Sequence, residues 1–209
     1  MVEWSIAAFR AAGRVCSIVV ACPPGHVHDL GGRDLDLVPG GATRAESVAN
    51  ALEAVGTELV AIHDAARPLV TPELIEGVAA TLVADPKADG AIAATPITDT
   101  IKRARAAAQG RRLWTLPPYR GAKSTVTVEE TVDRGQLWAA QTPQVFRVEA
   151  LRRALGAGPG VVAAATDEAM LVEAVGGRVL IHPSPPENLK VTTPLDLRVA
   201  ELLLGKAAE

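Results

Sequence analysis

The sequence predicts an α/β fold, in which a mostly parallel sheet carries helices on both faces and a β-arm protrudes from it. Short continuous apolar runs, such as SIVVA at residues 17–21, are typical of strands that are buried on both faces. Segments with helical periodicity alternate with these runs, which is the pattern of parallel strands joined by right-handed crossovers. The chain has 209 residues, of which 48% are hydrophobic, so it is long enough to bury a core of its own.

In the first third of the chain, helical and strand patterns follow one another from the first residues. Val2, Ile6 and Phe9 recur at spacings of three and four, which predicts an amphipathic helix. Thr43 and Glu46 form a capping-box pattern that opens a second helix. The elements predicted here are a helix over 2–12, a strand over 17–21, a loop, a helix over 44–55 and a strand over 59–62.

The same alternation continues toward the carboxyl end. Thr71 and Pro72 provide a helix N-cap and a first-turn proline, and Thr193 and Pro194 repeat this start signal. The elements predicted in this part are a helix from 72, a strand over 91–94, helices over 148–155 and 168–175, a strand over 178–182 and a helix from 194.

Residues 97–134 interrupt this alternation. They are rich in arginine and include the alternating run STVTV at 124–128, which predicts an extended β-arm. Because an exposed strand edge invites pairing with another chain, we expect the arm to contact a second subunit. The alternative is a disordered surface insertion over 104–123.

Composition and missing motifs exclude several classes of protein. The net charge of −3 and the 3% aromatic content argue against nucleic-acid binding, which needs a basic surface and stacking side chains. The sequence contains no GxSxG, GxxxxGK[ST], HExxH or GxGxxG motif. It has no apolar run long enough to span a bilayer and no leader pattern, so we expect a cytoplasmic protein.

Polar clusters follow the predicted strands, at the sheet edge where open parallel sheets bind ligands. Asp64 comes directly after the buried strand 59–62, where a carboxylate can hold Mg²⁺ on a nucleotide phosphate. The alternative is a structural ion pair between Asp64 and Arg67.

Two further clusters point to anion binding. In Gly40-Gly41-Ala42-Thr43-Arg44, glycines precede a helix N-terminus, which favours an anion, although such turns are also common for structural reasons. In the loop 187–192, Lys190 offers a point charge for a phosphate, and the alternative is a solvated lysine.

The ordered set of motifs is more specific than any one of them. GGATRAESV, HDAARP, PITDTIKR, TVDRGQLW, AAQTPQVF, TDEAML and ENLKVTTPLDL follow one another along the chain. Together they resemble the 2-C-methyl-D-erythritol 4-phosphate cytidylyltransferase family, from the first residue to about Leu204 except within the arm.

This resemblance implies a fold and an activity. The fold would be Rossmann-like, of the nucleotide-diphospho-sugar transferase type, in a homodimer with interlocked arms. The enzyme would join CTP and methylerythritol phosphate into 4-diphosphocytidyl-2-C-methyl-D-erythritol and release pyrophosphate, with Mg²⁺ as cofactor, in non-mevalonate isoprenoid synthesis.

The resemblance also implies roles for individual residues. Asp64 would serve the metal and the substrate hydroxyls, while Lys190 and Arg134 would hold the methylerythritol phosphate for attack. The expected contacts to the cytidine part are Gly41, Ala42, Arg44, Ser47 and Ala65. The expected contacts on the substrate side are Thr100, Thr142 and Thr166, with Arg134, Thr100 and Thr142 serving the pocket of a partner subunit.

The chain departs from the family pattern in three places. The family's N-terminal strand and its Gly-rich CTP loop have no counterpart here, so we expect residues 1–209 to be a single, N-terminally incomplete nucleotidyltransferase domain. The stretch between Arg103 and Thr131 is longer than usual, and Ala42 stands where many relatives carry an acidic residue. Alternative functions are a cytidylyltransferase for another polyol phosphate, such as ribitol 5-phosphate, and a non-catalytic binding or dimerisation protein.

Overall fold

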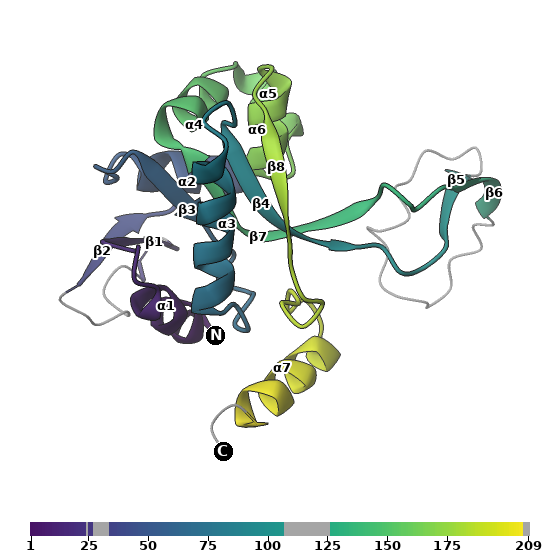
Figure 1. Ribbon diagram of the computed structural model, residues 1–209, viewed down its shortest axis with the longest axis horizontal. Coiled ribbons are helices and arrows are strands. Elements are labelled where there is room, and N and C mark those ends of the chain that lie inside the picture. The colour runs from purple at the N-terminus through teal and green to yellow at the C-terminus, as the bar shows by residue number, and fades with distance from the viewer. Residues whose placement is uncertain (24, 27–33, 107–125, 207–209) are drawn as a thin grey trace. The chain divides into compact units, whose positions relative to one another are not determined.

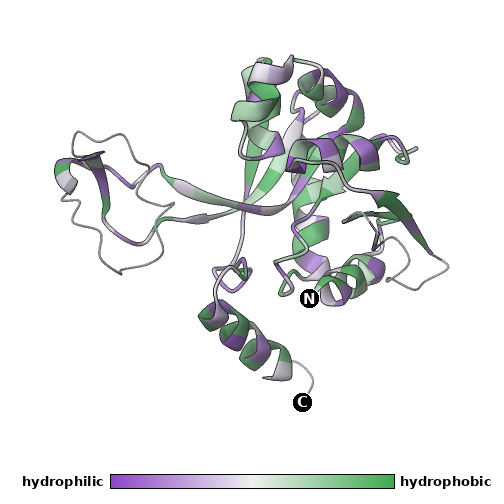
Figure 2. Ribbon diagram, turned by 180° about the vertical axis from the view of Figure 1, so that it is seen from behind, coloured by the Kyte–Doolittle hydropathy of each residue, from purple (hydrophilic) through white to green (hydrophobic). Residues whose placement is uncertain are grey.

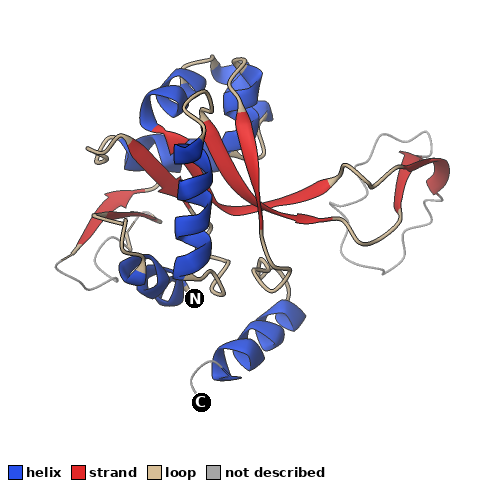
Figure 3. Ribbon diagram, viewed as in Figure 1, coloured by secondary structure: helices blue, strands red, loops and turns tan. Residues whose placement is uncertain are grey.

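The computed structural model describes residues 1–23, 25–26, 34–106 and 126–206. Among these residues the chain forms two compact units, one of residues 1–95 and 140–209 and one of residues 96–139. The larger unit alternates strands with helices (Figures 1 and 3). The predicted α/β class is therefore confirmed.

The first half of the larger unit begins with a helix, as the sequence predicts. Its elements are α1 (Val2–Ala11), β1 (Ile18–Cys22), β2 (Leu35–Pro39), α2 (Arg44–Leu52), β3 (Leu59–Ile62) and α3 (Pro72–Ala84). The predicted caps are present: the Thr43 hydroxyl accepts from Glu46 N, and the Thr71 hydroxyl accepts from Leu74 N. Helix α2 ends at Leu52, about one turn before the predicted end.

The second half of the larger unit adds three strands and four helices among the described residues. These elements are β4 (Gly90–Pro96), β7 (Trp138–Arg147), α4 (Val148–Leu155), α5 (Pro159–Ala164), α6 (Glu168–Ala174), β8 (Val179–Pro183) and α7 (Pro194–Lys206). Sequence reasoning did not find β2, β7 or α5. In β7, the motif AAQTPQVF lacks the continuous apolar run that marks the other buried strands, although six of the ten residues of β7 are buried.

The strands of the larger unit form two separate sheets. Strands β1 and β2 pair in parallel, and the second sheet has the order β3-β7-β4-β8. Strands β4 and β8 are parallel, whereas β3 and β7 are antiparallel. The described strands therefore include parallel pairs, as expected, together with an antiparallel pair that the sequence did not reveal.

Two apolar clusters form the core. One lies around Phe9, Val78 and Leu82, and the other lies around Phe146, Leu151 and Leu171. Coloured by hydropathy, the ribbon shows hydrophobic residues on the strands and helices of the larger unit, with hydrophilic residues between them along the helices (Figure 2). Helix α3 contributes Leu74, Ile75, Val78 and Leu82 at helical spacing, which is the amphipathic pattern of a helix that packs on a sheet.

The smaller unit contains an antiparallel pair of strands, β5 (Ile101–Ala106) and β6 (Val126–Val132). Exposed cross-strand ion pairs join Arg103 to Glu130 and Arg105 to Glu129. The register shifts between Arg103 and Ala104, as at a β-bulge. Most of the predicted insertion over 104–123 lies outside the described residues, and the contact of an arm over 97–134 with a second subunit stays a prediction.

Candidate functional site

Asp64 is the centre of a charged cluster at the end of β3. Its carboxylate lies 3.0 Å from Lys190 Nζ, 3.5 Å from an Arg44 nitrogen and 3.6 Å from Arg67 Nε. The Asp64 side chain is only 15% exposed. Three segments of the chain therefore place their cations around one carboxylate. Arg44 and Lys190, which the sequence predicted to be functional, therefore both contact Asp64. The ion pair between Asp64 and Arg67, which was the structural alternative, is also present.

This environment fixes the charge of Asp64. Burial by itself raises the pKa of the carboxyl, but Lys190, followed by Arg44 and Arg67, outweighs that effect and holds the pKa below its usual value. Asp64 is therefore ionised at neutral pH and can accept hydrogen bonds or bind a cation.

The loop that carries Lys190 is anchored by a buried asparagine. The Asn188 side chain is 1% exposed, and its Nδ2 donates to Gln141 Oε1 and to Thr142 O, each at 2.9 Å. The backbone of the same loop is bonded to the turn after β3, because Val191 N donates to Ala66 O at 2.8 Å and Arg67 donates to Asn188 O. These bonds hold the Lys190 backbone beside Asp64, although the Lys190 side chain is 45% exposed.

Arg44 connects Asp64 to a second carboxylate. Its guanidinium donates to both carboxylate oxygens of Glu168, a side chain that is 1% exposed. Burial raises the pKa of Glu168, and the Arg44 guanidinium opposes this rise. Because a buried carboxylate needs a partner, Glu168 holds Arg44 in the position from which it reaches Asp64.

His63 and Thr142 support the backbone at Asp64. Asp64 N donates to Thr142 Oγ1 at 3.0 Å, and Thr142 Oγ1 lies 3.0 Å from His63 Nδ1. His63 Nε2 lies 3.1 Å from the Arg67 carbonyl oxygen, which can only accept, so we assign the proton to Nε2. Thr142 then donates its hydroxyl proton to Nδ1. Burial lowers the pKa of His63 to about 4, so the ring is neutral at pH 7.

The glycine turn before α2 is tightly packed. A Cβ on Gly41 would lie 2.2 Å from Glu46 Cβ, so a larger residue cannot fit without moving the helix. Gly41 N donates to Ser47 Oγ, and Ala42 N donates to Glu46 Oε2. Two of the backbone donors that the sequence assigned to an anion therefore have partners within the chain, which matches the structural alternative for this turn.

The remaining candidate residues lie at other places. Ala65 follows Asp64 in the turn after β3 and is exposed. Thr166 lies before α6, where its hydroxyl is 3.9 Å from Met170 Sδ. Arg134 and Thr100 belong to the smaller unit, in which Arg134 donates to the Thr98 carbonyl. The geometry of the larger unit thus brings together Asp64, Lys190, Arg44 and Thr142.

A comparison with protein families shows which family the chain belongs to. The family model described as "IspD: 2-C-methyl-D-erythritol 4-phosphate cytidylyltransferase" matches residues 1–114 and 119–206. The chain belongs to the IspD family.

Curated relatives carry the same name in part or in full. The chain is 40% identical over 201 residues to the bifunctional enzyme IspD/IspF of Anaeromyxobacter dehalogenans (strain 2CP-C), a match that covers 93% of this chain and 47% of the relative. It is 39% identical to the 2-C-methyl-D-erythritol 4-phosphate cytidylyltransferase of Rubrobacter xylanophilus (strain DSM 9941 / JCM 11954 / NBRC 16129 / PRD-1), covering 96% of this chain and 81% of the relative. The chain spans about half the length of the bifunctional relatives that it matches.

Solved structures agree with this assignment. The 2-C-methyl-D-erythritol 4-phosphate cytidylyltransferase from Thermus thermophilus superposes with a TM-score of 0.75 at 33% identity. The match covers 97% of this chain and 87% of that structure. Among the described residues, no helix combines the length and the apolar character that crossing a membrane requires.

Within the IspD fold, sequence reasoning missed residues that act through buried contacts. Glu168 was assigned only a helix-start role, since nothing in TDEAML reveals a partner 124 residues earlier in the chain. His63 and Asn188 stood inside quoted motifs, HDAARP and ENLKVTTPLDL, without a role of their own. Their role depends on three-dimensional hydrogen bonding, which no sequence spacing encodes.

Proposed function

We propose that this chain transfers the cytidylyl group of CTP to 2-C-methyl-D-erythritol 4-phosphate, giving 4-diphosphocytidyl-2-C-methyl-D-erythritol and pyrophosphate. A phosphate oxygen of the acceptor attacks the α-phosphorus of CTP. The bond from that phosphorus to the bridging oxygen breaks, and pyrophosphate leaves with the electron pair. The observation that carries the proposal is the cluster in which Asp64 meets Lys190 and Arg44, in a member of the IspD family.

Charge neutralisation is the main demand of this reaction, because two anions must approach one another. Lys190 offers an ammonium that is held by its loop yet 45% exposed, so it can reach a phosphate of the acceptor. Arg44 is fixed by Glu168 and adds a second positive charge on the nucleotide side. Asp64 orients both cations before the substrates bind, which lowers the cost of positioning them.

Membership of the family supports cytidine contacts at Gly41, Ala42, Arg44, Ser47 and Ala65. Gly41 N and Ala42 N already have partners within the chain, so cytidine would have to contact other atoms of these two residues. On the acceptor side, Thr166 would contribute a hydroxyl group. Arg134 and Thr100 would act on the acceptor from the arm of a second subunit, in a homodimer. Thr142 would act on the acceptor through Asp64, because its buried hydroxyl already binds Asp64 N and His63.

Magnesium fits this site only together with the nucleotide. No group of three or more His, Cys, Asp or Glu side chains in the described parts of the chain is arranged to hold a metal ion. The ionised Asp64 carboxylate could supply an oxygen ligand, because Mg²⁺ in proteins often uses one carboxylate together with substrate phosphates. When bound, the ion would neutralise charge on the CTP phosphates. Asp64 would be its protein ligand.

The test is product formation by the 209-residue chain with CTP, Mg²⁺ and each of two acceptors, methylerythritol phosphate and ribitol 5-phosphate. Phosphorus NMR identifies the diphosphate product and the released pyrophosphate. We expect turnover with methylerythritol phosphate and at least tenfold less with ribitol 5-phosphate. The reverse preference would assign the alternative polyol phosphate. Tight CTP binding without product from either acceptor would assign a non-catalytic binding protein.

A further inference from the structure

Six of the buried polar side chains in the described part of the chain belong to one network. Hydrogen bonds and ion pairs connect all of them to Asp64, directly or through a shared partner. They are Gln141, Thr142, Gln144, Glu168, Ser184 and Asn188. Strand β7 alone supplies three of them, at positions 141, 142 and 144. An apolar side chain would fill the same space without needing partners, so the partners of the two glutamines show what each contributes.

Gln141 holds the segment that leads from β8 to Lys190. Its Oε1 accepts a hydrogen bond from Ser184 Oγ at 2.8 Å and another from Asn188 Nδ2 at 2.9 Å. Ser184 is also bound to β4, because its backbone N donates to Ala94 O at 2.8 Å. A single acceptor oxygen on β7 therefore fixes two points of the segment that carries the Lys190 ammonium.

Gln144 holds the start of α6. Its Nε2 donates to Asp167 Oδ2 at 2.9 Å, and its Oε1 accepts from Ala169 N at 3.3 Å. Asp167 is the N-cap of α6. Glu168 lies between the two residues that Gln144 binds, and its carboxylate accepts from Arg44. Gln144 therefore fixes the backbone from which Glu168 reaches Arg44.

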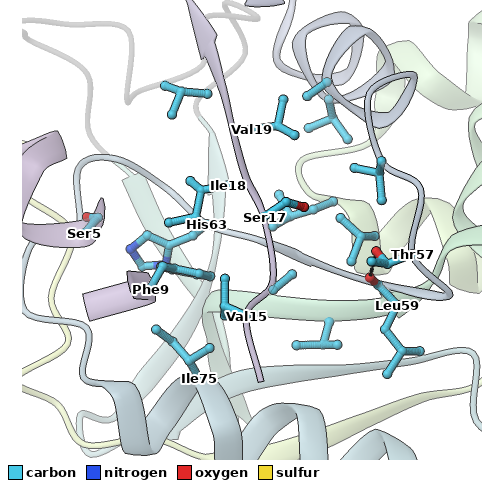
Figure 4. Close-up of a pocket in the computed structure, with 18 of the residues that line it drawn as sticks. Ser5, Phe9, Val15, Ser17, Ile18, Val19, Thr57, Leu59, His63 and Ile75 are labelled. Atoms are coloured by element: carbon cyan, nitrogen blue, oxygen red, sulfur yellow. Dashed lines mark hydrogen bonds between the residues drawn. The ribbon is translucent and has the colours of Figure 1, made fainter. Parts of the chain in front are cut away.

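Thr142, between the two glutamines, supports the carboxylate on which both cations converge. Its Oγ1 accepts from Asp64 N and contacts His63 Nδ1, each at 3.0 Å. The His63 ring lies beside the ring of Phe9 on α1, with the ring centroids 5.4 Å apart (Figure 4). Asp64 thus has a support of its own, so one cation can be displaced without moving the carboxylate that orients the other.

We propose that Gln141 and Gln144 are positioning residues for two different substrates. Gln141 sets Lys190 for the acceptor phosphate, and Gln144 sets Arg44 for the nucleotide. This division rests on the proposed function, which gives the two cations their roles. Gln144 Nε2 also reaches Gln141, but at the backbone oxygen and at 3.4 Å, so the bonds made by the two glutamine side chains are separate.

The experiment replaces each glutamine by methionine and by glutamate in the full 209-residue chain. Methionine keeps an unbranched side chain of similar length but removes the amide hydrogen bonds. Glutamate acts in opposite ways at the two positions. At position 141 it keeps the acceptor oxygen that Ser184 and Asn188 use. At position 144 it removes the donor to Asp167 and places a second carboxylate there.

Steady-state pyrophosphate release gives the KM for each substrate. We expect Gln141→Met to raise the KM for the acceptor at least fivefold and to leave the KM for CTP within twofold, and Gln144→Met to do the reverse. Gln141→Glu should stay within twofold of the wild type, whereas Gln144→Glu should resemble Gln144→Met. Equal rises of both KM values in either methionine variant would overturn the division. A lower melting temperature with both KM values unchanged would show a structural role alone and would also overturn the proposal.

Amide hydrogen exchange without substrates separates a failure of this proposal from a failure of the proposed function. Val191 N and Met170 N each donate in a hydrogen bond of one supported segment, to Ala66 O and to Asp167 Oδ1 respectively. We expect the methionine variant at 141 to speed exchange at Val191 at least tenfold and to leave Met170 unchanged, with the opposite result for the variant at 144. The same exchange rates in both variants would overturn the proposal. An inactive wild type with the expected exchange pattern would overturn the proposed function but not the positioning.

Discussion

His63 gives the folded protein a pH dependence that can be calculated from the structure. Burial lowers its pKa from 6.5 to about 4, and the neutral ring bonds to Thr142 and to the Arg67 carbonyl. Because its pKa is lower in the folded chain than in the unfolded chain, His63 binds a proton less readily when the protein is folded. The contribution of the neutral His63 ring to the free energy of unfolding is therefore complete above pH 6.5, and it is lost as the pH falls from 6.5 toward 4.

The magnitude follows from the size of the shift. Each pKa unit corresponds to about 1.4 kcal/mol, so the full shift corresponds to about 3 kcal/mol. About 2 kcal/mol of this is lost between pH 7.5 and pH 5. Urea denaturation at pH 7.5, 6 and 5 measures the free energy of unfolding directly.

The variant His63→Gln keeps an amide for hydrogen bonding but cannot titrate. We expect its unfolding free energy to fall by about 2 kcal/mol less than that of the wild type between pH 7.5 and 5. Identical pH dependence in the wild type and in His63→Gln would refute the assignment of a buried neutral histidine beside Asp64.

Substitutions at three other contacts should change stability or activity. Arg44→Gln leaves the Glu168 carboxylate buried without its cation. It should lower the free energy of unfolding by about 3 kcal/mol in urea denaturation. A change below about 1 kcal/mol would contradict a stabilising ion pair between Arg44 and Glu168. Gly41→Ala should destabilise by about 1–3 kcal/mol, because its Cβ would lie 2.2 Å from the Cβ of Glu46 in the first turn of α2. Gly56→Ala, with nothing within 4 Å, should remain within about 0.5 kcal/mol, and equal effects of the two would refute the close approach. Asn188→Ala should raise the KM for the acceptor phosphate at least fivefold and lower the melting temperature, because it removes the hydrogen bonds that anchor the Lys190 loop. An unchanged KM in steady-state assays would show that Asn188 does not position Lys190.

Sequence patterns predicted the elements that are encoded locally. The caps at Thr43 and Thr71 are present where the pattern places them, and β3 spans the predicted residues 59–62. Each of these signals depends on residues within one turn or one strand. Strand β7 was missed because its polar side chains, Gln141 and Gln144, are buried by hydrogen bonds to distant residues rather than marked by an apolar run.

The sequence predicted only part of the candidate site, because it gave no role to Glu168, His63 or Asn188 and could not show which side chains meet. Asp64 and Lys190 were found because each follows a strand pattern and carries a charge suited to a phosphate or a metal. Their 3.0 Å contact and the bond from Arg44 to Glu168 could not be foreseen, because they join residues more than a hundred positions apart. The division of the strands into two sheets could not be predicted either, because it depends on which distant strands pair.

We propose that Lys190 acts on the acceptor phosphate in a CTP-dependent transfer. This role is tested most directly by steady-state pyrophosphate release with CTP, Mg²⁺ and methylerythritol phosphate, in the wild type, in Lys190→Gln and in the control Lys87→Gln. We expect Lys190→Gln to lower kcat/KM for the acceptor by at least a hundredfold, while Lys87→Gln, at an exposed position after α3, should stay within twofold. Wild-type turnover in Lys190→Gln would contradict this role of Lys190.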